Sequence, residues 1–163
     1  MAVEEGPTGY WVILVTLFTA YVLAVLPLGP WLAWLRPEWL LLVVTYWVIA
    51  LPHRVGLVTA ALAGLLMDVL EGAVLGQNVL ALSLVALVAR LLYQRMRVFS
   101  LAQQALTVFL LAGLHQLVCQ WIQNLEGAGS RSFLFLLPAL SSALFWPPVL
   151  FLLRGARRYY HVQ

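Results

Sequence analysis

The sequence predicts an all-α membrane protein, a single polytopic bundle of about six transmembrane helices. Hydrophobic residues make up 64% of the 163-residue chain and charged residues only 9%, with a mean hydropathy of +0.97. A soluble domain has close to a quarter of its residues charged, and each membrane-spanning helix needs about 20 apolar residues. Apolar segments joined by short polar turns are therefore expected to form one integral membrane domain over residues 1–163, which leaves no room for a soluble catalytic domain.

The first two predicted spans cover residues 10–26 and 38–52. The first span ends at the turn "PLGP". A tryptophan-rich stretch, "WLAWLRPEW", follows it, as is typical of a membrane–water boundary. The second span is short for a bilayer. We expect it either to draw length from its tryptophan-rich flank or to thin the membrane locally.

The remaining four spans are expected over residues 55–71, 77–94, 101–123 and 133–153. Because a proline removes a backbone donor, Pro138, Pro147 and Pro148 are expected to kink the last span. An alternative arrangement joins the second and third spans as a re-entrant hairpin. That arrangement would bury Arg54 at mid-depth, which is costly, so six full spans are preferred.

The arginines predict the orientation, because cytoplasmic loops of membrane proteins are enriched in basic residues. All nine basic residues are arginine, and a six-span arrangement places seven of them on the side of the two termini. These seven are Arg54, Arg90, Arg95, Arg97, Arg154, Arg157 and Arg158. Only Arg36 and Arg131 fall on the other side, so both termini are expected in the cytoplasm. Membrane orientation also explains the net charge of +3 without a nucleic-acid partner.

A stripe of small residues with one acid runs along the third predicted span. Residues four apart share a helix face, and this small-residue stripe consists of Gly56, Ala60, Gly64, Asp68 and Gly72. Small residues let helices approach closely, and an ionisable residue within a membrane normally faces protein. We therefore expect a helix-packing or partner interface here. Asp68 is either bonded to a donor, such as Arg36 or an amide of the turn "EGAVLG", or simply wet near the membrane surface.

Polar residues of the fifth span allow two interpretations. Gln116, Gln120 and Gln123 follow helical spacing, close to His115. This face either packs within the bundle, with amides bonded across helices, or lines a ligand cavity. The histidines lack the spacing of metal ligands, the single Cys119 excludes an internal disulfide, and no nucleophile motif is present. The residues therefore predict no enzyme activity, metal or cofactor.

Three blocks of sequence, "RPEWLLLVVTYWVIALPHRVG", "GLLMDVLEGAVLGQNVLAL" and "RVFSLAQQ", resemble the rod shape-determining protein MreD family of Gram-negative bacteria. The resemblance covers essentially the whole chain. It implies a non-enzymatic inner-membrane component of the elongasome, which inserts side-wall peptidoglycan in rod-shaped cells. It also implies a direct partnership with MreC, in a complex with MreB, the RodA glycosyltransferase and a penicillin-binding transpeptidase.

The fold implied by this resemblance is similar to the substrate-binding membrane subunits of energy-coupling-factor vitamin transporters. An uptake subunit for a small molecule is therefore the alternative function. Such a subunit needs several convergent polar groups in a cavity, and polar residues within the spans are few. A scaffold acting through helix faces in the lipid bilayer is the preferred interpretation.

Overall fold

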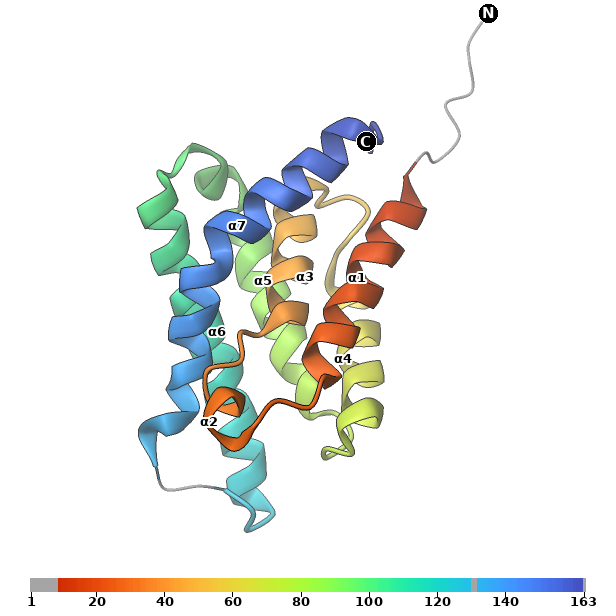
Figure 1. Ribbon diagram of the computed structural model, residues 1–163. Helices are drawn as coiled ribbons and strands as arrows, with labels where there is room; N and C mark the ends of the chain where they lie inside the picture. Colours follow the sequence, from red (N-terminus) through yellow and green to blue (C-terminus); the bar gives the residue numbers. More distant parts are fainter. Residues whose placement is uncertain (1–8, 130–131, 163) are drawn as a thin grey trace, which may run out of the picture.

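Seven α-helices and one short 3₁₀ segment make up the computed structural model (Figure 1), which describes residues 9–129 and 132–162. These residues form no β-strand, so the predicted all-α class is confirmed. The helices are α1 (Tyr10–Val25), α2 (Pro30–Ala33), α3 (Trp39–Ala50), α4 (Leu57–Glu71), α5 (Gln77–Val98), α6 (Leu101–Leu125) and α7 (Leu137–Tyr159), with the 3₁₀ segment at Phe133–Leu136.

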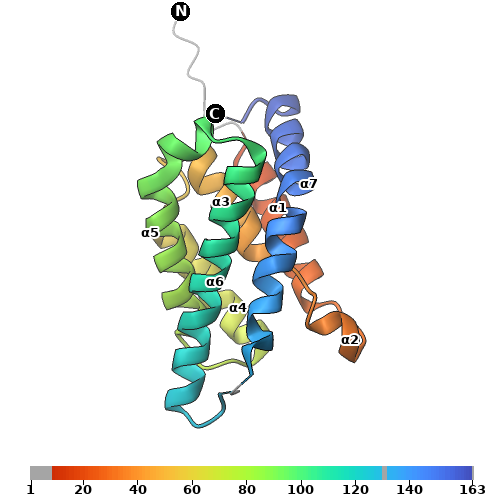
Figure 2. The ribbon, with the colours of Figure 1, turned by 90° about the vertical axis from the view of Figure 1, so that its left-hand side faces the viewer.

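Six helices run up and down along a common direction, while α2 is a single turn to the side (Figures 1 and 2). Short connections favour this antiparallel arrangement. The end of the bundle where α1 begins and α7 ends is called here the basic end, because most arginines lie there. The opposite end, called the acidic end, holds every acidic residue of the described ranges: Glu38, Asp68, Glu71 and Glu126.

Helix α3 lies at the centre of the bundle, in contact with α1, α5 and α7. Ten of its twelve residues are buried, and the indole of Trp47 donates to Thr16 Oγ1 of α1 at 2.9 Å. Twelve helical residues extend about 18 Å, well short of a hydrocarbon core of about 30 Å. Because protein rather than lipid surrounds α3, its length does not have to match the bilayer. This environment accounts for the short second span.

Three helices, α5, α6 and α7, are long and apolar enough to cross a membrane, and α1 and α3 are shorter apolar helices. Large apolar side chains also cover the outside of the bundle; Phe18 is 69% exposed and Leu144 75%. A soluble monomer rarely exposes extended apolar patches, whereas lipid solvates them well. The chain is therefore a membrane protein, and the number of its complete crossings stays a prediction.

Helix α7 bends partway along its length (Figure 1) and contains Pro147 and Pro148 in its interior. An interior proline removes a helical hydrogen bond and is a common cause of such a bend. Pro138 does not act in this way, because it lies in the first turn, where N–H groups have no helical partner. Both α5 and α7 extend past the predicted residues 94 and 153, with arginines that suit a helix C-terminus.

Helices α4 and α5 approach closely because Gly64 leaves room for the backbone of α5. A Cβ atom at Gly64 would lie 2.5 Å from the carbonyl oxygen of Asn78 and 2.7 Å from the backbone nitrogen of Val79. Both are backbone atoms of the first turn of α5, so they cannot rotate away as a flexible side chain can. The absence of a side chain at Gly64 is what permits this packing.

Gly64→Ala is therefore expected to lower the stability of the purified protein by roughly 1–3 kcal/mol, the usual cost of overpacking. Gly113→Ala on α6 is the matched control, because no atom outside the neighbouring residues and backbone of α6 itself lies within 4 Å of its Cβ position, and alanine favours a helix. Thermal unfolding in one detergent, followed by circular dichroism, measures both variants. Equal melting temperatures would contradict the close approach of α4 and α5.

Candidate functional site

The small-residue stripe lies where α4 meets α5, and its two ends coincide with the ends of α4. Ala60 and Asp68 are both 0% exposed, and Gly64 lies against the α5 backbone. Gly56 is the N-cap of α4, and Gly72 is its C-cap with a φ of 63°. A left-handed C-cap favours glycine because a side chain is strained there. The middle of the stripe thus packs within this chain, while its ends cap the helix.

Asp68 caps the start of α5 from the neighbouring helix. Its Oδ2 accepts a hydrogen bond from the Gly76 N–H, and its Oδ1 accepts from the backbone N–H and the side-chain amide of Asn78, each at 2.9 Å. The first N–H groups of a helix lack helical partners and are partially positive, so a carboxylate suits them. Gly76 at the N-cap has no side chain to do this. The sequence suggests two donors for Asp68, Arg36 and an amide of the turn "EGAVLG". The donor in the structure is the amide of Gly76, the last residue of that turn.

Arg36 closes the end of α1 and does not bind Asp68. Its guanidinium donates to the carbonyl oxygens of Ala24 and Leu26. The last carbonyls of a helix are unpaired and partially negative, so an arginine stabilises them. Arg131, which the sequence assigned to the same side, lies outside the described residues.

The arginines proposed to set the topology belong to the basic end. The guanidinium of Arg54, in the α3–α4 turn, lies 5.0 Å from the ring centroid of Tyr10, the first residue of α1. Arg97 near the end of α5 donates to the carbonyl oxygens of Ile49 and Ala50 at 3.0 and 3.1 Å. The α3–α4 turn is therefore level with the start of α1 and the end of α5, at the end of the bundle. The other five lie in the second half of α5 or near the end of α7: Arg90, Arg95, Arg154, Arg157 and Arg158.

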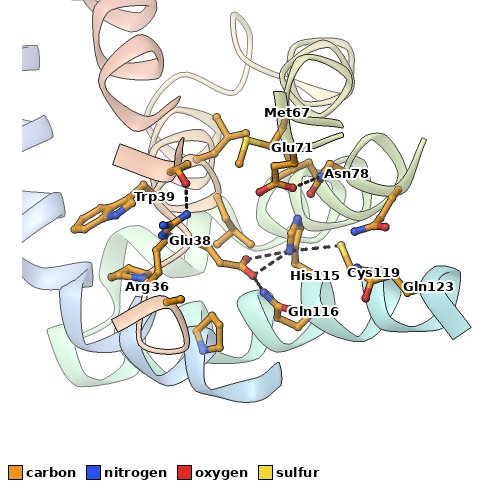
Figure 3. A pocket seen from close by; sticks show the side chains of 18 residues that line it. Arg36, Glu38, Trp39, Met67, Glu71, Asn78, His115, Gln116, Cys119 and Gln123 are labelled. Carbon is orange, nitrogen blue, oxygen red and sulfur yellow. Dashed lines mark hydrogen bonds and ion pairs between the residues drawn. The ribbon is translucent and has the colours of Figure 1, made fainter. Parts of the chain in front are cut away.

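A polar cluster at the acidic end is organised by Glu38, the residue that precedes α3 (Figure 3). Glu38 Oε1 accepts from Nδ1 of His115 at 3.2 Å and from the side-chain amide of Gln116. The Glu38 backbone N–H donates to Ser142 Oγ at 2.9 Å, and Ser142 in turn donates to the carbonyl oxygen of Pro138. The cluster thus ties the start of α3 to α6 and α7.

The polar face predicted for the fifth span lies only partly at a cavity. His115, Gln116 and Gln123 line a cavity of about 260 Å³ at the acidic end, together with Glu38. Gln120 does not line this cavity. Several further polar side chains do line it: Arg36, Glu71, Gln77 and Asn78. Convergent polar groups, which the sequence alone did not predict in this number, are therefore present.

Sequence reasoning used Glu38 only as the boundary of a span and missed its role. Glu38 and His115 are 77 residues apart in the chain, so no local spacing connects them. The available signal was an acid directly before an almost entirely apolar helix, where an unpaired charge would be costly. That signal indicates that a partner exists but does not identify it.

Cys119, His115 and Glu38 are residue types that serve as nucleophile, base and acid in some enzymes. Here they are not arranged as a catalytic relay. Cys119 Sγ lies 4.0 Å from Nδ1 of His115, the same ring nitrogen that faces Glu38. A catalytic relay needs one ring nitrogen for the acid and the other for the nucleophile. Nor does any group of three His, Cys, Asp or Glu side chains in the described ranges have the arrangement to hold a metal ion. The arrangement is suited to binding a polar group.

Comparison with known proteins agrees with the resemblance seen in the sequence. The profile of a family described as rod shape-determining protein MreD matches residues 6–156. The rod shape-determining protein MreD of Haemophilus influenzae is 34% identical over 147 residues, which cover 88% of this chain and 91% of that protein. No solved structure matches the chain. Both the stripe and the Glu38 cluster fall within the matched residues, and the chain belongs to the rod shape-determining protein MreD family.

Proposed function

We propose that this protein is a non-enzymatic scaffold of the bacterial inner membrane that supports rod shape through helix–helix contacts with MreC. The match to a family named for rod shape determination, over residues 6–156, is the observation that carries the proposal. The RodA glycosyltransferase, a penicillin-binding transpeptidase and MreB are proposed as further members of the assembly. Side-wall peptidoglycan synthesis is the process that this assembly serves.

The outer face of α4 supports a role in helix–helix contact. Val58, Leu62 and Val69 on this face are 74%, 62% and 63% exposed, whereas the opposite face carries the small-residue stripe. Apolar side chains in lipid associate with a partner helix through close packing. We propose that the stripe holds α4 and α5 together as one firm surface, and that the outer face of α4 receives a transmembrane helix of MreC.

The polar cavity favours a second candidate function, a membrane subunit that binds a small molecule for uptake. Its volume of about 260 Å³ lies just below the usual range for ligand pockets, about 300–1,000 Å³. A vitamin-sized ligand would therefore need a larger cavity. The proposed likeness to the substrate-binding subunits of energy-coupling-factor transporters stays a prediction, and the scaffold is preferred.

Six complete crossings with both termini in the cytoplasm are the proposed topology. Reporter fusions after Arg36 or Glu126 are expected to read as periplasmic, because few arginines lie on that side. Fusions after Arg97 or at the carboxyl terminus are expected to read as cytoplasmic. Alkaline phosphatase and green fluorescent protein fusions measure the two states. A periplasmic carboxyl terminus would contradict the six-crossing arrangement.

Photocrosslinking in cells tests the proposed docking face. A photoreactive residue at Leu62 on α4 is expected to capture MreC, whereas one at Leu110 on α6 is the control. The two positions are matched, since both leucines are 62% exposed. Immunoblotting for MreC gives the yield at each position. A stronger adduct from Leu110 would show that the partner docks elsewhere.

Asp68→Leu is expected to insert normally but to round the cells, because it disturbs the α4–α5 pair that supports the docking face. The buried backbone N–H of Asn78 would lose its acceptor, at about 1–3 kcal/mol, and so would the half-buried N–H of the N-cap Gly76. Complementation of a deletion strain at native expression, with membrane abundance measured beside cell shape, gives the result. Glu126→Leu, at an exposed acid of the same end, is the control and should give rods. Rods from Asp68→Leu would mean that this cap is dispensable for function.

A further inference from the structure

Unfilled hydrogen-bond acceptors gather in the cavity at the acidic end. Gln77 is 5% exposed and lines the cavity, and its Oε1 is buried without a hydrogen-bond partner among the residues described. Glu38 Oε2 is likewise buried and accepts no hydrogen bond in that part of the chain. His115 Nδ1 lies 3.0 Å from Oε2 and 3.2 Å from Oε1, so a single ring N–H faces both oxygens and leaves room for a second donor. A buried acceptor without a partner costs free energy, so these two atoms indicate a missing donor.

Glu71 supplies a third acceptor at the end of α4. Its Oε2 accepts from the side-chain amide of Asn78 at 3.3 Å, which leaves Oε1 for another donor. The carboxylates of Glu38 and Glu71 are directed toward the same space (Figure 3). Asp68, in contrast, is already saturated by three hydrogen bonds to the start of α5.

The carboxylate of Glu71 forms no ion pair with another of the described residues. Of the two basic side chains that line the cavity, His115 faces Glu38 instead. The two terminal nitrogens of Arg36 already serve carbonyl oxygens at the end of α1, and its buried Nε–H has no acceptor among the described residues, which leaves it for an oxygen atom of a ligand. A partly buried carboxylate is stable only when it is paired and hydrogen-bonded. The missing donor is therefore expected to carry a positive charge.

We propose that this cavity binds a primary ammonium group, carried by a free small amine or by the ethanolamine head group of a lipid. An ammonium has three donors and no acceptor, and the open acceptors are likewise three, on Glu38, Glu71 and Gln77. A guanidinium presents five donors in one plane, more than this site can satisfy. A metal ion lacks the three ligands it would need from the described side chains.

Ethanolamine binding to the purified full-length protein in phosphatidylglycerol nanodiscs tests the site. Choline carries the same charge without an N–H donor, and ethylene glycol carries no charge. Ethanolamine is expected to raise the melting temperature with concentration, and the other two to bind at least about tenfold more weakly. Equal shifts with ethanolamine and choline, or no shift with ethanolamine, would overturn the proposal.

Variants with matched controls test which side chains accept hydrogen bonds from the bound ammonium group. Gln77→Leu is expected to weaken ethanolamine binding about tenfold, whereas Gln94→Leu, exposed at the other end of α5, leaves it unchanged. Glu38→Gln is expected to weaken binding further, and Glu126→Gln is its control. Because Glu38→Gln also alters the His115 cluster, its melting temperature without ligand is measured as well. Gln77→Glu adds a charge at the site and should tighten binding; unchanged affinity in both Gln77 variants would refute the assignment.

Lipid composition separates the two sources of the ammonium group. If the lipid head group is the ligand, free ethanolamine binds more weakly in phosphatidylethanolamine nanodiscs, because the head group competes for the cavity. If a free amine is the ligand, the affinities in the two lipids agree. Either result supports an ammonium site. None of these measurements requires a partner protein, so they are independent of the proposed scaffold role.

Discussion

Helix ends inside a membrane protein need partners for their unpaired backbone groups, because lipid supplies no hydrogen bonds. In this bundle the partners come from side chains elsewhere in the chain. Arg36 serves the last carbonyls of α1, and Arg97 serves those of α3. Asp68 serves the first N–H groups of α5, and Gln104 serves carbonyls near its end. Since most of these bonds join two helices, satisfying the helix ends also holds the helices in their arrangement.

The two most buried acids illustrate how one chemical group takes two roles. Asp68 meets three donors within the chain, so its charge is fully used in holding α4 and α5 together. Glu38 meets donors on Oε1 from His115 and Gln116, whereas its Oε2 faces only the shared His115 ring nitrogen and has no hydrogen-bond partner of its own among the described residues. A saturated carboxylate contributes to stability, whereas an unsaturated one in a cavity can still bind a ligand. Both carboxylates are largely buried, so burial does not distinguish their roles. The number of hydrogen-bond donors that each carboxylate meets does.

Helix α4 takes part in each of the features on which the proposals depend. Its inner face carries Gly64 and Asp68 against α5, its last residue, Glu71, lines the cavity, and Leu62 faces outward. At fifteen residues it is shorter than α5, α6 and α7. Its position therefore depends on its bonds to α5 more than on its own length in the bilayer. A scaffold and a small ligand site are compatible here, because they use different surfaces of the same helix.

Local sequence decides much of this protein, because the bilayer acts on each segment by its own hydropathy and charge. Composition alone predicted an all-α membrane protein, and the four-residue spacing placed Gly64 and Asp68 on one helix face. The quoted sequence blocks were enough to predict the family. Three features depended on the tertiary structure: the tolerance of a twelve-residue α3, the choice of Gly76 over Arg36 as a donor to Asp68, and the pairing of Glu38 with His115. Each of these depends on which distant segments become neighbours. That outcome follows from the packing of whole helices, and neither the spacing nor the composition of a single segment contains it.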